Sequence, residues 1–125
     1  MAIAIGSTGD IRRDGFVWGG GFGAEGRQTA LNICRGFEAP SAGFEMPSNA
    51  TKAQRLCKVV AVFRDKCFAI AFDGDARTPA TGFGWAVEND LRSAEAVALN
   101  KCMAAADSAR RNICKVTYSH CDGAD

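Results

Sequence analysis

Several groups of residues in this 125-residue chain have types and spacings that suggest chemistry. The first is Gly21-Phe22-Gly23-Ala24-Glu25-Gly26, which has the G-x-G-x-x-G spacing of dinucleotide-binding turns. Such turns aim backbone N–H groups at a pyrophosphate from the start of a helix. The alternating parallel β-α-β order that surrounds a dinucleotide site is missing here. We therefore expect a flexible turn between a strand and a helix, in preference to a weak anion nest, and no cofactor.

Four carboxylates form the second group: Asp73, Asp75, Glu88 and Asp90. Two of them in one pocket would supply an acid and a base for hydrolysis, and several together would suit calcium. The twelve-residue spacing of calcium-binding loops is absent. We favour hairpin turns and helix N-terminal charge as their roles, so the sequence assigns no catalytic residue and no metal ligand.

His120 is the only histidine, so any histidine-dependent mechanism would have to use it. The adjacent Ser119 does not make a Ser-His pair, because neighbouring residues of a strand point to opposite faces. We expect His120 to face solvent near the end of the chain.

Six cysteines form the last group: Cys34, Cys57, Cys67, Cys102, Cys114 and Cys121. No two of them form the C-x-x-C spacing of structural zinc hairpins or redox dithiols. An even number at wide spacing favours three disulfides over buried free thiols or a metal site. Because disulfides persist in oxidising compartments, we expect a secreted or periplasmic protein.

The elements that position these residues repeat along the chain. Blocks match in the same order: Ala2-Ile3-Ala4 with Ala69-Ile70-Ala71, Gly15–Trp18 with Gly82–Trp85, Ala30–Cys34 with Ala98–Cys102, Cys57-Lys58-Val59 with Cys114-Lys115-Val116, and Cys67 with Cys121. The periodicities predict two strands, a helix and a third strand in each copy. The expected fold class is α+β: two β-β-α-β repeats with antiparallel sheets and two helices, related by pseudo-two-fold duplication and stapled by disulfides. We expect one domain over residues 1–125, with repeat one at about 1–67 and repeat two at about 68–121.

The repeats also bear on how the cysteines pair. Six cysteines allow fifteen pairings, and several of these are unchanged when the copies are exchanged. We favour one bond from helix to strand in each copy and one bond between the copies: Cys34–Cys57, Cys102–Cys114 and Cys67–Cys121. Trp18 and Trp85, at matched positions, are expected to fill equivalent parts of the core.

These features resemble the bacterial family called Domain of unknown function (DUF4189). The resemblance rests on the Ala-Ile-Ala strand, the aromatic strand with Trp18 or Trp85, the Ala-Leu-x-x-Cys helix and the Cys-Lys-Val strand, and it extends from Ala2 to Cys121. It implies secretion or periplasmic residence, since the family includes secreted mycobacterial proteins. The family supplies no agreed catalytic residues, so none is carried over. The chain departs from the pattern in a long insertion at 40–50 and in its start at Met1.

Charge and hydropathy argue against two classes of partner. Fifteen basic and fourteen acidic residues leave a net charge of +1, too small to attract nucleic acid or an anionic membrane over distance. The pairs Arg12-Arg13 and Arg110-Arg111 are too short for a basic patch, and we expect them to be solvated. No apolar run approaches the roughly 20 residues of a membrane span. Because Met1 leads directly into a short strand, we expect that a signal segment was removed and that Met1 is not the native start.

We expect a non-enzymatic binding module that presents a rigid surface to a protein partner, such as a toxin that it neutralises or a host factor. The irregular segment 37–50, with Phe44 and Met46, is the expected contact, because loops on rigid scaffolds often carry function. Two alternatives remain open. One is a small envelope hydrolase that draws an acid and a base from Asp73, Asp75, Glu88 and Asp90; the other is a structural secreted protein without a ligand.

Overall fold

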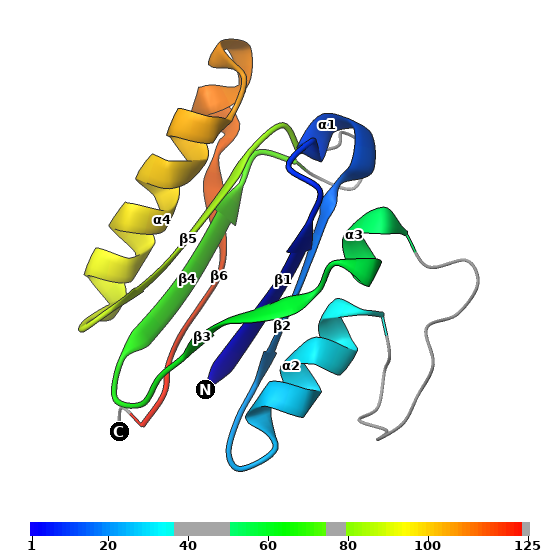
Figure 1. Cartoon of the computed structure of the whole chain (residues 1–125). Helices are drawn as coiled ribbons and strands as arrows, with labels where there is room; N and C mark the ends of the chain where they lie inside the picture. Colours follow the sequence, from blue (N-terminus) through cyan, green and yellow to red (C-terminus); the bar gives the residue numbers. More distant parts are fainter. Residues whose placement is uncertain (37–50, 75–79, 124–125) are drawn as a thin grey trace. The chain divides into compact units, whose positions relative to one another are not determined.

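The computed structural model describes residues 1–36, 51–74 and 80–123. By their internal contacts these residues form two compact units, Met1–Phe63 and Arg64–Asp125. The division lies before Cys67, which begins a strand of the second unit, and so precedes the boundary expected from the repeats. Figure 1 shows the elements of each unit.

The first unit is a three-stranded antiparallel sheet with a helix packed on one face. β1 (Ala2–Ser7) lies between β2 (Phe16–Gly21) and β3 (Lys58–Val62). The helix α2 (Gly26–Cys34) packs on β2 and β1, and the short helices α1 (Ile11–Asp14) and α3 (Lys52–Arg55) lie in the connections. The alternation of β1 explains the packing, because Ala2 and Ala4 meet Ala30 and Cys34 of α2 while the isoleucines point to the other face.

The second unit has the same plan. β4 (Cys67–Phe72) lies between β5 (Phe83–Glu88) and β6 (Lys115–Cys121), and both pairings are antiparallel. α4 (Leu91–Ala105) lies along this sheet, and the 3₁₀ helix η1 (Ser108–Ile113) connects it to β6. The small residues Ala94, Ala98 and Cys102 of α4 meet the alanines of β4 in a buried cluster. The predicted α+β class with antiparallel sheets is therefore confirmed.

Each helix approaches its sheet closely because a glycine lies beneath it. A Cβ added to Gly19 would lie 2.5 Å from the carbonyl oxygen of Ala30 and 2.7 Å from the nitrogen of Cys34. A Cβ added to Gly84 would lie 2.5 Å from the nitrogen of Cys102. Non-bonded carbon atoms pack at about 3.5–4.0 Å, so neither position has room for a side chain.

The strand registers show which positions of the two units correspond. Ala4 pairs with Gly19 and Val59, and Ala71 pairs with Gly84 and Val116. Each outer strand also has one extra residue at the same place, Val60 in β3 and Thr117 in β6. The units thus share strand order, register and helix placement. Their origin by duplication and their pseudo-two-fold relation stay predictions.

The expected equivalence of the two tryptophans is wrong. Trp18 pairs with Ile5 of β1. The residue of β4 equivalent to Ile5 is Phe72, which pairs with Phe83, so Trp18 corresponds to Phe83. Trp85 pairs with Ile70 of β4. The residue of β1 equivalent to Ile70 is Ile3, which pairs with Gly20, so Trp85 corresponds to Gly20. In the first unit the hairpin from Ala4 to Gly19 is two residues longer than the equivalent hairpin of the second unit, from Ala71 to Gly84. The matched aromatic blocks are therefore two residues out of alignment.

The three disulfides join Cys34 to Cys57, Cys102 to Cys114 and Cys67 to Cys121, which are the pairs named from the sequence. The first two tie the packed helix of each unit to the start of its last strand. The role expected for the third bond is wrong, because Cys67 and Cys121 face each other on neighbouring strands of the second unit. The bond links two strands of the second unit and does not join the two copies. The expectation that Cys67 and Cys121 are equivalent residues of the two repeats is also wrong, since both belong to the second unit.

Candidate binding surface

The carboxylate of Asp73 lies at the end of β4 and is fully buried. It accepts hydrogen bonds from the backbone N–H of Thr81 (2.8 Å) and Gly82 (3.0 Å) and from the Thr81 hydroxyl. Arg110 of η1 completes the set with its Nε, 3.0 Å from Asp73 Oδ2, and also donates to the Asp73 carbonyl. Thr81 Oγ1 in turn accepts from the N–H of Asp107 at 3.0 Å. This network joins the β4 end, the segment before β5 and η1.

The same contacts decide the charge of Asp73. Burial raises the pKa of its carboxyl, but hydrogen bonds from the Thr81 hydroxyl, from the N–H groups of Gly82 and Thr81 and from Arg110 outweigh burial and lower the pKa below its ordinary value. A carboxylate held ionised, with its oxygens occupied by four donors, is poorly suited to accept a proton from a substrate. The geometry supports a structural role for Asp73.

Among the candidate carboxylates that the structure describes, Glu88 and Asp90 do not lie beside Asp73. Glu88 pairs with Cys67, at the opposite end of β4, and the six residue steps from Cys67 to Asp73 span about 20 Å of strand. Asp90 is the N-cap of α4 and accepts from the Ser93 N–H at 2.8 Å and hydroxyl at 3.0 Å. It thus supplies the helix N-terminal charge expected from the sequence. Asp75 lies outside the described residues.

The glycine-rich segment forms a tight turn from β2 into α2. Gly23 has φ +73°, a left-handed conformation that favours glycine. Gly21 and Gly26 pack against each other, and a Cβ on Gly21 would collide with the Gly26 carbonyl. Close backbone packing accounts for Gly21 and Gly26, and the left-handed conformation accounts for Gly23, so the expected strand-to-helix turn is confirmed.

His120 lies on β6, exposed and stacked on Tyr118 with ring centroids 6.4 Å apart. Ser119 points to the other face, where its hydroxyl lies 3.4 Å from Glu95 of α4. The two side chains therefore lie on opposite faces, as expected, and do not form a Ser-His pair.

η1 and its flanks form an exposed segment between two fixed points of the second unit. Ser108, Ala109, Arg111, Asn112, Ile113 and Lys115 are all exposed. The segment is held by the Asp73–Arg110 ion pair and by the Cys102–Cys114 disulfide. The expectation that Arg110-Arg111 is solvated is thus correct for Arg111 but wrong for Arg110, whose side chain is only 22% exposed because it reaches Asp73.

Sequence reasoning missed this surface and pointed elsewhere. Phe44 and Met46, the expected contact residues, lie outside the described residues. The available signal at η1 was an arginine pair between two cysteines twelve positions apart. In the part of the chain that the structure describes, no helix is long and apolar enough to cross a bilayer. The three disulfides are consistent with an extracytoplasmic location.

The Asp73 network predicts a pH dependence of stability. Because the folded-state pKa of Asp73 is lowered, its stabilising contribution is present above its ordinary pKa of about 4 and is lost as pH falls through the folded value. Asp73→Asn should remove this contribution, so the free energy of unfolding should fall less steeply with acidification below about pH 4 than in the unsubstituted protein. Urea unfolding at several acid pH values measures the difference between the two proteins. Asp14 and Asp90, whose pKa values are lowered by hydrogen bonds from Arg13 and Ser93, contribute equally to both. Parallel curves would contradict the assignment.

Comparison with protein-family models matches residues 1–121 to the model described as Domain of unknown function (DUF4189). No curated protein and no solved structure matches the chain.

Proposed function

Since the chain belongs to the DUF4189 family, whose description names no activity, we propose from its surface that it is a non-enzymatic protein-binding module that works outside the cytoplasm, secreted or periplasmic. The observation that carries the proposal is the segment from Ser108 to Lys115, whose residues other than Arg110 and Cys114 are exposed and which is held by the ion pair of Arg110 with the buried Asp73 and by a disulfide. Loops fixed on a rigid scaffold are common carriers of recognition.

The physical argument is preorganisation. A surface segment that is already fixed loses little conformational entropy on binding, so more of its contact energy appears as affinity. The network that fixes η1 contains a fully buried carboxylate, and burying a charge costs free energy even when it is paired. If this contact contributed only to stability, an apolar contact at the same place would stabilise the fold as well. The three disulfides add support for the location, because such bonds persist in oxidising compartments.

Affinity capture tests the proposal. The disulfide-intact protein is immobilised, an extracytoplasmic fraction is passed over it, and a reduced and alkylated sample serves as the control. We expect a protein that is retained by the intact form alone and that then binds the purified module with a fixed stoichiometry. No such protein, or equal retention by both samples, would contradict the proposal.

A further inference from the structure

η1 turns two of its three faces to solvent. Side chains three positions apart share a face of a 3₁₀ helix, because each turn contains three residues. Arg110 therefore shares a face with Ile113, and this face lies toward Asp73, which Arg110 contacts at 3.0 Å. The residues of the other two faces are all exposed: Ser108 with Arg111, and Ala109 with Asn112. η1 thus presents a guanidinium, a hydroxyl and an amide to a partner.

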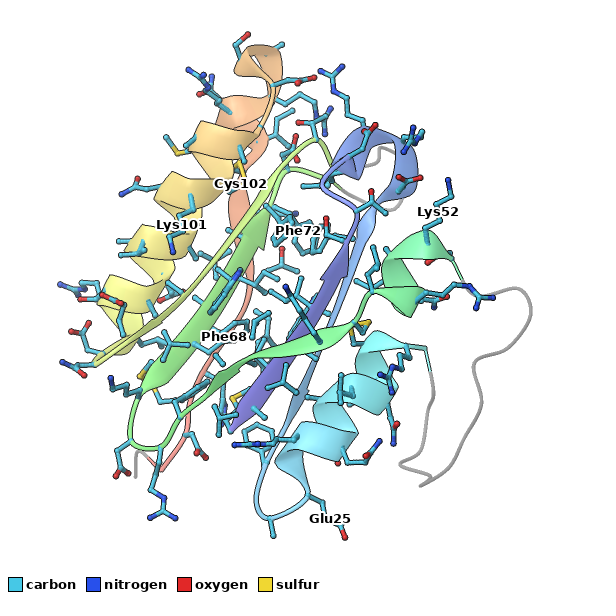
Figure 2. The ribbon with its side chains drawn as sticks, viewed as in Figure 1. Glu25, Lys52, Phe68, Phe72, Lys101 and Cys102 are labelled. Atoms are coloured by element: carbon cyan, nitrogen blue, oxygen red, sulfur yellow. A yellow bond between two sulfur atoms is a disulfide. The ribbon has the colours of Figure 1, made fainter. Side chains whose placement is uncertain are left out.

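Two exposed apolar side chains lie beside the disulfide that follows η1. Met103 comes directly after Cys102, which Figure 2 labels on α4, and Ile113 comes directly before Cys114. Met103 is 38% exposed and Ile113 is 46% exposed. The bond holds the Cα atoms of the two cysteines 6.1 Å apart, so the backbone that carries both apolar side chains is fixed near one point. Among the described residues of the second unit, the only other large apolar side chain with such exposure is Leu91.

Positive charge is concentrated in the same part of the chain. Residues 96–121 contain four basic residues and one acidic residue, whereas the rest of the chain contains eleven basic and thirteen acidic residues. Arg110 pairs with Asp73, and Lys101 donates to a backbone carbonyl of β5 at 3.3 Å. Arg111 is exposed, and no residue that the structure describes forms an ion pair with it. An excess of positive charge at one surface of a nearly neutral protein favours a partner that carries carboxylates.

We propose that η1 and Met103 bind a segment of a partner protein in which a carboxylate pairs with Arg111 and a nearby apolar side chain covers Ile113 and Met103. The inference rests on the proposed binding function and names the chemistry of the partner. A guanidinium binds a carboxylate through two parallel hydrogen bonds, and the Ser108 hydroxyl and Asn112 amide add donors and acceptors beside it. Methionine is unbranched and adapts its shape to an apolar partner. Because η1 is already fixed, the segment loses little conformational entropy on binding.

Two other classes of partner match less of this surface. The phosphates of a nucleic acid would pair with Arg111 but leave Ile113 and Met103 in water. An anionic membrane is attracted only weakly by so few basic residues. A protein segment with a carboxylate and an apolar side chain satisfies both parts of the surface, and arginine beside buried apolar contacts is typical of the residues that carry most of the affinity in protein interfaces.

The probe is a phage-displayed library of random 12-residue peptides, panned on the disulfide-intact protein. We expect enriched peptides to combine Asp or Glu with Leu, Ile, Phe or Trp. Arg111→Glu and Ile113→Ser should each weaken binding of a synthetic enriched peptide by about tenfold or more, the effect of losing a well-placed contact. Arg92→Glu and Leu91→Ser are the matched controls, because they make the same changes at exposed residues where α4 begins, and their affinities should stay within about twofold.

A charge exchange tests the contact with Arg111 directly. Replacing the acidic residue of the enriched peptide by lysine should weaken its binding to the unsubstituted protein by about tenfold or more and restore its binding to the Arg111→Glu variant, because opposite charges then meet again. Isothermal titration calorimetry of the four combinations measures the recovery. If the lysine peptide binds Arg111→Glu no better than it binds the unsubstituted protein, the inference is overturned.

Circular dichroism of each variant verifies that it is folded. Enrichment of neutral or basic peptides, or peptide binding that neither Arg111→Glu nor Ile113→Ser weakens, would overturn the inference. So would a library without enrichment, above all if the protein instead cosedimented with vesicles of phosphatidylglycerol and phosphatidylcholine. A captured natural partner that both variants still bind with full affinity would overturn this surface and leave the binding function standing. An empty capture column together with an unenriched library would overturn both.

Discussion

Replacement of Arg110 by methionine is expected to lower the free energy of unfolding by about 3–5 kcal/mol. The substitution keeps an apolar stem of similar length but removes the cation 3.0 Å from the buried Asp73 carboxylate. The carboxylate would stay in place with its hydrogen bonds from Thr81 and Gly82 but without a countercharge, and an uncompensated buried charge is costly. Urea unfolding at neutral pH measures the loss. Faster amide hydrogen exchange in η1 should accompany it, because Arg110 is the side chain that anchors this helix to β4.

Two controls separate the ion pair from a general effect at this surface. Arg111→Met changes the exposed neighbour in the same way and should alter stability by no more than about 0.5 kcal/mol. The double variant Asp73→Asn/Arg110→Met removes both charges and should recover part of the loss, because a neutral amide needs no countercharge. Equal effects of Arg110→Met and Arg111→Met would show that the buried pair contributes nothing.

Replacement of Gly19 by alanine is the second change with a large expected effect, a loss of about 3 kcal/mol from overpacking. The added Cβ would lie 2.5 Å from the Ala30 carbonyl oxygen and 2.7 Å from the Cys34 nitrogen. Both atoms belong to the backbone of α2, which cannot move aside without losing its packing on β2, and the Cys34–Cys57 disulfide restrains the helix further. Thermal unfolding followed by circular dichroism measures the effect.

The adjacent glycine provides the matched control. A Cβ on Gly20 points to the opposite face of β2 and meets the end of the Met1 side chain at 3.0 Å and Ile3 Cδ1 at 3.5 Å. A methionine tip rotates easily, so Gly20→Ala should change stability by no more than about 1 kcal/mol. If the two alanine variants are equally stable, close contact between α2 and β2 is not what the glycine provides.

Local patterns in the sequence predicted the strands and the two packed helices α2 and α4, but not the short helices α1, α3 and η1. The repeats suggested the disulfide partners. Short apolar runs bounded by glycine and aspartate are strong strand signals, and Ala98 and Cys102 mark a helix face by their spacing. These local patterns did not align the two units correctly in the second strand of each. Matching Trp18 to Trp85 by identity ignored the hairpin between the strands, and only the pairing register reveals the two additional residues of the first unit. Identity of side chains is a weaker guide to equivalence than hydrogen-bonded register.

The candidate surface could not be predicted for a different reason. Asp73 and Arg110 are 37 positions apart, and nothing in the composition of either segment links them. Their pairing depends on where η1 places an arginine relative to the end of β4, which is a property of the tertiary structure. The exposed Ile113 is equally hidden in the sequence, because an aliphatic residue beside a cysteine and a valine is typical of a core.

The extra residues Val60 and Thr117 in the outer strands also bear on how the chain behaves at high concentration. β3 has the sequence Lys-Val-Val-Ala-Val, and a short uncharged run of β-branched residues on an outer strand is a template for adding strands from other chains. An added residue bends the strand and breaks the even spacing of its N–H and C=O groups, so a flat incoming strand cannot match them along its whole length. Lys58 at the start of this run adds charge repulsion between identical edges. The two irregularities therefore act against fibril growth.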